Sequence, residues 1–135
     1  MPTKQKTVSG GCLCGSIRYQ LSETPLEASY CHCRMCQKNS GSAFAIAALF
    51  NQSALQFIGN EPTWYQSSQT ARRGFCPTCG TPILFQKLTG NKEVSINIGT
   101  LDDPNAITPE YHYGIESELS WLKIEDDLPR YQCES

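Results

Sequence analysis

Seven of the eight cysteines in this chain lie in three short clusters, and no other feature restricts its fold as strongly. The clusters are Cys12-Leu13-Cys14, Cys31-His32-Cys33-Arg34-Met35-Cys36 and Cys76-Pro77-Thr78-Cys79. Thiolates grouped this closely are typical ligands of tetrahedral zinc, which binds sulfur at about 2.3 Å. Seven is one short of two closed four-cysteine sites, and a zinc with three protein ligands keeps one position open for chemistry. The count therefore predicts one closed and one open metal site.

The cellular setting decides between metal ligands and disulfides. The first residues, Met1 to Lys6, are followed by no apolar run, so we expect no export signal. No stretch approaches the roughly 20 apolar residues that cross a bilayer. We therefore expect a cytoplasmic protein, where cysteine clusters bind metal and disulfides are rare. A Cys-x-Cys disulfide would also close a small and strained ring.

Length and charge narrow the possible partners. A chain of 135 residues predicts a single domain over residues 1–135, with enough material for a buried core. The formal net charge of −2 provides no basic surface for nucleic acid and no attraction to an anionic membrane. We expect neither as a partner. Nothing in the sequence indicates an oligomeric state.

The pattern of short apolar segments predicts a mainly β fold with little helix. Each segment is bounded by Gly, Pro, Asn or Ser, which is typical of strands in an all-β domain. The predicted strands cover residues 16–21, 43–50, 54–58, 63–67, 82–86, 94–99 and 111–115. One or two helical turns are expected over residues 33–40, and a further turn over 102–105. Gly15 and Gly80 follow cysteine pairs, where a positive φ turns backbone amides toward sulfur.

The clusters divide by spacing into two kinds of site. Cys12 and Cys14 form one short pair and Cys76 and Cys79 another, and pairs from distant segments suit a structural zinc that clamps a long loop. The remaining three cysteines, Cys31, Cys33 and Cys36, come from one six-residue segment.

The fourth ligand of the three-cysteine site is left open by the sequence. It can be substrate or water, or the site can be closed by Cys133, His32 or His112. We expect Cys133 to be a free surface thiol, the ring of His32 to point away from the metal of its neighbours, and His112 to face solvent.

Three thiolates favour a particular chemistry. A zinc with three Cys ligands carries a net charge of −1, which weakens it as a Lewis acid and makes it poorly suited to generating hydroxide for hydrolysis. It suits a soft fourth ligand such as a substrate thiol, which it holds as a nucleophilic thiolate. This favours making or breaking a carbon–sulfur bond.

Around these cysteines the sequence resembles the glutathione-dependent formaldehyde-activating enzyme family, whose domain also occurs in centromere protein V. The resemblance is carried by Gly10–Tyr19, Cys31–Phe44 and Arg73–Pro82, with later echoes at Asn97–Asp103, Trp121 and Asp127–Arg130. It implies an Mss4-like fold of small β-sheets pinned by two zinc ions per chain. It further implies a structural zinc at Cys12, Cys14, Cys76 and Cys79 and a catalytic zinc at Cys31, Cys33 and Cys36. The activity for which the family is named is the condensation of formaldehyde with glutathione to S-hydroxymethylglutathione.

Two functions from different classes remain. The first is a carbon–sulfur lyase acting on a small-molecule thiol and a small aldehyde. For a glutathione-like thiol with two carboxylates, the candidate binding residues are Arg34, Lys38, Arg72 and Arg73, although each is also compatible with an ordinary surface charge. The alternative is a zinc-stabilised protein-interaction module in which both metals are structural.

Overall fold

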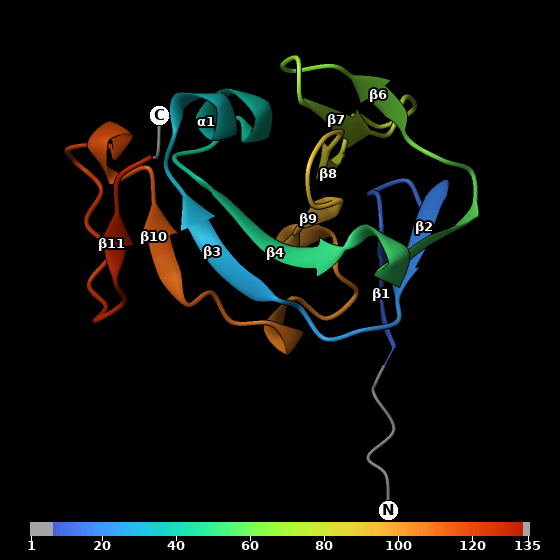
Figure 1. Cartoon of the computed structure of the whole chain (residues 1–135), viewed down its shortest axis with the longest axis horizontal. Coiled ribbons are helices and arrows are strands. Elements are labelled where there is room, and N and C mark those ends of the chain that lie inside the picture. Colours follow the sequence, from blue (N-terminus) through green and yellow to red (C-terminus); the bar gives the residue numbers. More distant parts are fainter. Residues whose placement is uncertain (1–6, 134–135) are drawn as a thin grey trace, which may run out of the picture.

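A computed structural model describes residues 7–133, which form two β-sheets and one short α-helix (Figure 1). The N-terminal residues 1–6, in which we expect no export signal, lie outside this range. Among the described residues, no helix is long and apolar enough to cross a membrane. The prediction of a mainly β fold with little helix is confirmed.

The smaller sheet has three antiparallel strands. Its order is β1 (Val8–Gly11), β2 (Ile17–Leu21) and β5 (Leu55–Gly59). Apolar and polar residues alternate along β2, so its apolar face is buried in the core. Gly10 in β1 has to be a glycine, because a side chain there would collide with the Tyr19 hydroxyl and the Thr100 carbonyl. This close approach lets the hydroxyls of Tyr19 and Thr100 hydrogen-bond at 2.7 Å, which ties the small sheet to the turn after β9.

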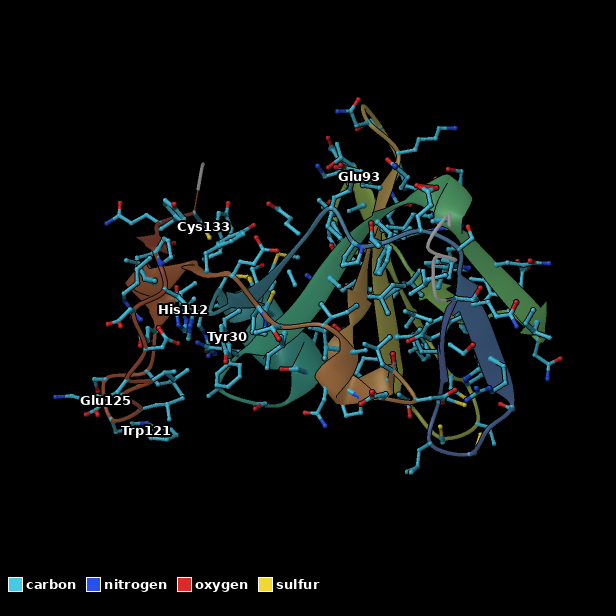
Figure 2. The ribbon with its side chains drawn as sticks, turned by 90° about the horizontal axis from the view of Figure 1, so that it is seen from below. Tyr30, Glu93, His112, Trp121, Glu125 and Cys133 are labelled. Carbon is cyan, nitrogen blue, oxygen red and sulfur yellow. The ribbon has the colours of Figure 1, made fainter. Side chains whose placement is uncertain are left out.

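The larger sheet has eight strands in the order β11-β10-β3-β4-β9-β8-β7-β6. In chain order these are β3 (Glu27–Cys31), β4 (Ala45–Asn51), β6 (Thr63–Tyr65), β7 (Ala71–Phe75), β8 (Pro82–Lys87), β9 (Glu93–Asn97), β10 (Tyr111–Tyr113) and β11 (Arg130–Tyr131). Strand β10 runs parallel to β3 and β11, and the remaining pairs are antiparallel. Figure 2 shows His112 of β10 close to Tyr30 of β3, its partner in the register. All seven predicted strands are present, whereas β1, β3, β7 and β11 were not predicted.

The two faces of the central strands have different environments. Ala48 and Phe50 of β4, and Val94 and Ile96 of β9, are buried in a core shared with the small sheet. The residues between them point to the opposite face, because successive side chains alternate along a strand. That opposite face is only half-buried, and it lies on the side of the three-cysteine segment.

Helix α1 (Arg34–Ser40), the one α-helix within residues 7–133, begins shortly after β3 and confirms the predicted turns. Cys33 is its N-cap and accepts a hydrogen bond from the amide of Cys36 through its sulfur. The helix ends at Gly41, whose φ of 68° is the left-handed conformation that glycine adopts without strain. A short 3₁₀ turn, Pro104–Ala106, occupies part of the second predicted turn.

Candidate active site

The four cysteines of the two distant pairs meet in one cluster. Cys12 and Cys14 lie in the turn between β1 and β2, and Cys76 and Cys79 lie in the turn between β7 and β8. Their four sulfurs all lie within 4.8 Å of one another. The Sγ atoms of Cys12 and Cys14 are 3.6 Å apart, and those of Cys14 and Cys76 are 3.8 Å apart. A disulfide requires about 2.05 Å, whereas two thiolates on one tetrahedral zinc are about 3.8 Å apart. The cluster therefore fits a shared metal ion.

Hydrogen bonds to sulfur prepare this cluster for a cation. The amide of Ile17 donates to Cys12 at 3.3 Å, and the amide of Cys79 donates to Cys76 at 3.4 Å. Gly15 and Gly80 have φ values of 81° and 80°, as the sequence predicted. Burial would raise the pKa of Cys12, but hydrogen bonds from the Ile17 amide and from neighbouring side chains lower it to about 7. A hydrogen bond from the nearby Thr81 hydroxyl lowers the pKa of Cys79 to about 5.

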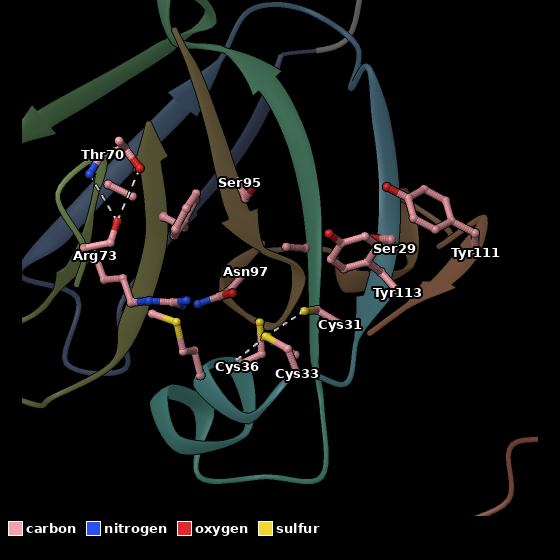
Figure 3. A pocket seen from close by; sticks show the side chains of 16 residues that line it. Ser29, Cys31, Cys33, Cys36, Thr70, Arg73, Ser95, Asn97, Tyr111 and Tyr113 are labelled. Atoms are coloured by element: carbon pink, nitrogen blue, oxygen red, sulfur yellow. Dashed lines mark hydrogen bonds between the residues drawn. The ribbon is translucent and has the colours of Figure 1, made fainter. Parts of the chain in front are cut away.

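The three remaining clustered cysteines gather where β3 meets α1. Cys31 ends β3, Cys33 caps the helix and Cys36 lies in its first turn (Figure 3). Their sulfurs also lie within 4.8 Å of one another, and those of Cys31 and Cys33 are 3.3 Å apart. The hydrogen bond from the Cys31 thiol lowers the pKa of Cys33 to about 2 and raises the pKa of Cys31 itself. Three sulfurs that share protons in this way offer a binding site for a metal cation, which can replace those protons.

None of the three residues considered as a closing ligand joins this cluster within residues 7–133. Cys133 is half-buried rather than on the open surface, and its amide donates to the Glu116 carboxylate at 3.0 Å. Its sulfur approaches Cys33 across Gly114, where an added Cβ would lie 3.3 Å from the Cys133 sulfur and 2.9 Å from the Cys33 amide nitrogen.

The histidines behave differently from one another. The ring of His32 hydrogen-bonds to His112 and does not join the sulfurs of its neighbours. The expectation that His112 faces solvent is wrong, because this side chain is 0% exposed. Its strand lies between β3 and β11, an arrangement that the sequence pattern did not reveal.

A pocket of about 410 Å³ opens beside the three-cysteine cluster, and all three of these cysteines line it. Its floor is the outer face of β4 and β9, where Ala45 and Ala47 leave space and Ser95 and Asn97 present polar groups (Figure 3). These polar residues were not predicted as part of a site. Their signal is present in the sequence, because the apolar positions of β9 alternate with Ser95 and Asn97.

Of the four basic residues considered for binding, Arg73 is the one that lines the pocket. Its guanidinium lies 5.0 Å from the centre of the Phe85 ring. Arg72 points elsewhere, since it lies 3.7 Å over the Trp64 ring and donates to Gln86 at 2.6 Å.

The other two basic residues lie on α1 outside the pocket lining. Arg34 donates a hydrogen bond to Gln37 within the helix, and Lys38 is exposed in the last turn.

A second hollow of about 330 Å³ adjoins the pocket. Thr70, Ala71 and Phe85 line both, so the two spaces are neighbours. The second hollow is also lined by Lys87, which pairs with Glu93 at 3.3 Å on an exposed surface. Each of the two neighbouring hollows is thus lined by one cation, Arg73 in the first and Lys87 in the second.

The chain is similar to known proteins in both sequence and structure. A family model described as "Glutathione-dependent formaldehyde-activating enzyme" matches residues 7–117. A protein of Schizosaccharomyces pombe named as an uncharacterized lyase is 31% identical over 88 residues, which cover 65% of this chain and 64% of the yeast protein. The chain thus matches less than two thirds of that relative's length. A crystal structure of a Rhodobacter sphaeroides protein superposes with a TM-score of 0.59 at 28% identity, over 75% of this chain and 91% of that one.

Proposed function

The chain belongs to the glutathione-dependent formaldehyde-activating enzyme family, and we propose that it is a carbon–sulfur lyase that forms or cleaves adducts between a thiol and a small aldehyde. The observation that carries this proposal is the opening of the three-cysteine cluster onto a pocket, with all three cysteines in its wall. The lyase name of the yeast relative supports the same reaction class. In the proposed reaction the sulfur forms a bond to the aldehyde carbon, and the thiol proton passes to the carbonyl oxygen.

The roles of the two clusters follow from their surroundings. We assign Cys12, Cys14, Cys76 and Cys79 to a structural zinc, and Cys31, Cys33 and Cys36 to a zinc with one open position. When bound at the three-cysteine site, zinc would supply a soft cation that keeps an incoming thiol ionised and nucleophilic near neutral pH. Cys33 is suited to its role because it caps α1, where backbone amides stabilise a thiolate.

Pocket residues are placed to hold the two reactants. The Arg73 guanidinium can bind a carboxylate of the thiol through charge-assisted hydrogen bonds. The carboxamide of Asn97 is fixed by donating one hydrogen to the Pro82 carbonyl at 2.9 Å. A second amide hydrogen remains on the same nitrogen, and it can donate to the aldehyde oxygen as charge develops there.

The presence of one cation in each of the two neighbouring hollows favours a thiol with two carboxylates. Arg73 lies near the cysteines, and Lys87 lies in the adjoining hollow beyond Phe85. A glutathione-like peptide with its sulfur at the cysteines can place one carboxylate at each cation. A short thiol with one carboxylate reaches Arg73 alone.

The test measures formaldehyde consumption with glutathione, corrected for the spontaneous reaction. The wild-type protein should accelerate adduct formation, and Cys36→Ser should abolish this because two thiolates hold zinc poorly. Lys87→Met should raise KM for glutathione and leave KM for a short monocarboxylate thiol unchanged. The change in KM for the two thiols separates the role of Lys87 from a general loss of stability.

Zinc-edge X-ray absorption distinguishes the lyase from the zinc-stabilised interaction module. A lyase should show fewer than four sulfurs per zinc on average, with the number rising when glutathione is added. Four sulfurs at both zinc ions before any thiol is added, together with no acceleration, would replace the lyase by the interaction module.

A further inference from the structure

Behind the three-cysteine cluster, two fully buried histidines lie in one hydrogen-bonded chain. His32 and His112 are both 0% exposed, and their Nε2 and Nδ1 atoms, respectively, are 2.9 Å apart. The Nε2 atom of His112 lies 2.9 Å from one carboxylate oxygen of Asp126 and 3.2 Å from the other. Burying the two imidazole rings is costly unless each has a partner, and Asp126 supplies one from the exposed segment before β11.

The partners determine where the protons sit. A carboxylate only accepts, so Nε2 of His112 carries a hydrogen and donates it to Asp126. Nδ1 of a neutral His112 then accepts from Nε2 of His32. Within residues 7–133, Nδ1 of His32 is buried and has no hydrogen-bond partner. This direction of donation leaves an unpaired acceptor there rather than a more costly unpaired N–H donor.

The hydrogen-bonded chain of side chains ends at His32, which is the residue between two of the clustered cysteines. His32 separates Cys31 from Cys33, and its backbone is held as well as its ring. Its amide donates to the Tyr113 carbonyl at 2.8 Å, and its carbonyl accepts from the Gln37 side chain at 2.8 Å. A residue fixed at its ring, amide and carbonyl restricts the backbone from which both neighbouring sulfurs project.

Aromatic rings pack around the histidines and limit their movement. Tyr30 stacks on His112 with ring centres 4.4 Å apart and planes 9° from parallel (Figure 2). Phe44 lies against the His32 ring at 5.6 Å. The histidine pair is thus held in one orientation.

Asp126, at the other end of the hydrogen-bonded chain, lies beyond the region that the family model matches. That match ends at residue 117, and Asp126 belongs to the C-terminal segment, residues 118–133. The amide of Leu128 donates to Asp126 at 3.1 Å, and β11 in the same segment pairs with β10. An ion pair between Glu118 and Arg130 joins the two ends of the segment.

We propose that the buried His32 and His112, anchored by Asp126 at the surface, form a brace that positions Cys31 and Cys33 as metal ligands, so that the C-terminal segment completes the three-cysteine site. The inference rests on the metal site of the proposed function and not on its substrates. The three residues are positioning residues, because they act on the ligand segment and lie behind the pocket.

The test is zinc release from the protein loaded with two zinc ions, followed with a chromogenic chelator. In Asp126→Ala, one of the two ions should leave about 10–100 times faster than in the wild type, which is the usual effect of removing an outer partner of metal ligands. The other ion should leave at the wild-type rate. Asp126→Asn retains an acceptor oxygen and should restore most of the retention, and Asp127→Ala, at the adjacent exposed position, is the matched control.

Two results would overturn the brace. The first is release of both ions from Asp126→Ala at wild-type rates, or equal acceleration of both, which indicates general destabilisation. The second comes from the wild type alone, so it holds even if the variant does not fold: nitrogen NMR that finds the His32 proton on Nδ1 contradicts the proposed direction of donation. A wild type without thiol–aldehyde activity, combined with selective zinc loss in Asp126→Ala, would remove the proposed function and leave the brace in place.

Discussion

The two cysteine clusters should contribute unequally to stability, and Cys76→Ser and Cys36→Ser form the pair of variants that tests this. Serine is close to cysteine in size but is a much poorer zinc ligand, so each variant releases one metal. The four-cysteine cluster joins Cys14 to Cys76, which are 62 positions apart in the chain. The three-cysteine cluster spans a single six-residue segment. Losing the metal of the four-cysteine cluster therefore frees a long loop, whereas losing the metal of the three-cysteine cluster frees a local turn.

The difference can be estimated from loop-closure entropy. Closing a loop costs the unfolded chain about (3/2)RT ln n, so a loop of roughly 60 residues rather than about 6 adds about 2 kcal/mol of stabilisation. A chain of 135 residues unfolds with an entropy of about 0.28 kcal/mol/K, at roughly 2.1 cal/mol/K per residue. The 2 kcal/mol thus corresponds to about 7 °C in Tm. Cys76→Ser should melt about 7 °C or more below Cys36→Ser.

The measurement is thermal unfolding by calorimetry, with zinc content determined on the same samples. Each variant should retain about one zinc ion, and Cys36→Ser should stay folded because the other cluster still joins the distant segments. If Cys76→Ser has the same Tm as the wild type, or if Cys36→Ser is the less stable of the two variants, the assignment of the four-cysteine cluster as the structural clamp is wrong.

Three further predictions concern the pocket and its surroundings. Cys133→Ser should keep both zinc ions and any activity, and loss of one zinc equivalent would make this thiol the fourth ligand. Arg73→Met should raise KM for glutathione about 10–100-fold, since a charge-assisted hydrogen bond contributes about 1.5–3 kcal/mol, whereas Arg72→Met should not, because that side chain packs on Trp64. Ala47→Leu fills the pocket floor and should lower turnover with little change in Tm, whereas Ala48→Leu overpacks the core and should cost about 1–3 kcal/mol in unfolding free energy without entering the pocket.

The division of the cysteines into two groups could be predicted because their spacing restricts which of them can lie together. Two short pairs can only join by bringing distant turns together, and a three-cysteine segment can only form a local site. The β class could also be predicted, because strands such as β2 and β9 alternate apolar and polar residues. The structure confirms both the class and the grouping of the sulfurs. That the metal is zinc, and that the chain is one domain over its whole length, stay predictions.

The strands that were missed have sequences that do not resemble buried strands. Strand β7 contains two adjacent arginines, and it is stable because Arg72 stacks on Trp64 of β6 while Arg73 reaches the pocket from the same strand. Strand β3 has one fully buried residue, Ala28, and its remaining side chains are only partly buried. Strand β7 lacks the apolar alternation on which strand prediction depends, and in β3 the alternation is short, with Ala28 and Tyr30 as its apolar positions.

The hydrogen-bonded chain of His32, His112 and Asp126 could not be predicted from the sequence, for a different reason. His32 and His112 are 80 positions apart and meet because β10 pairs with β3 in parallel, a nonlocal pairing that no local pattern indicates. Asp126 joins them from the segment before β11, 14 positions after His112. A histidine between two metal ligands and a histidine in a Tyr-His-Tyr strand each look like a solvent-facing or isolated side chain until the register is known.

The location of the proposed chemistry follows from the two faces of strands β4 and β9. One face is apolar and buried against the small sheet, which the four-cysteine cluster holds in place through the turn between β1 and β2. A rigid sheet then presents its other face, where Ala45 and Ala47 are too small to fill the space beneath the cysteines at the start of α1. The pocket exists because large side chains lie on one face of these strands and small ones on the other. Loss of the metal from the structural cluster should therefore change the pocket indirectly, through the sheet, without direct contact with any residue that lines the pocket.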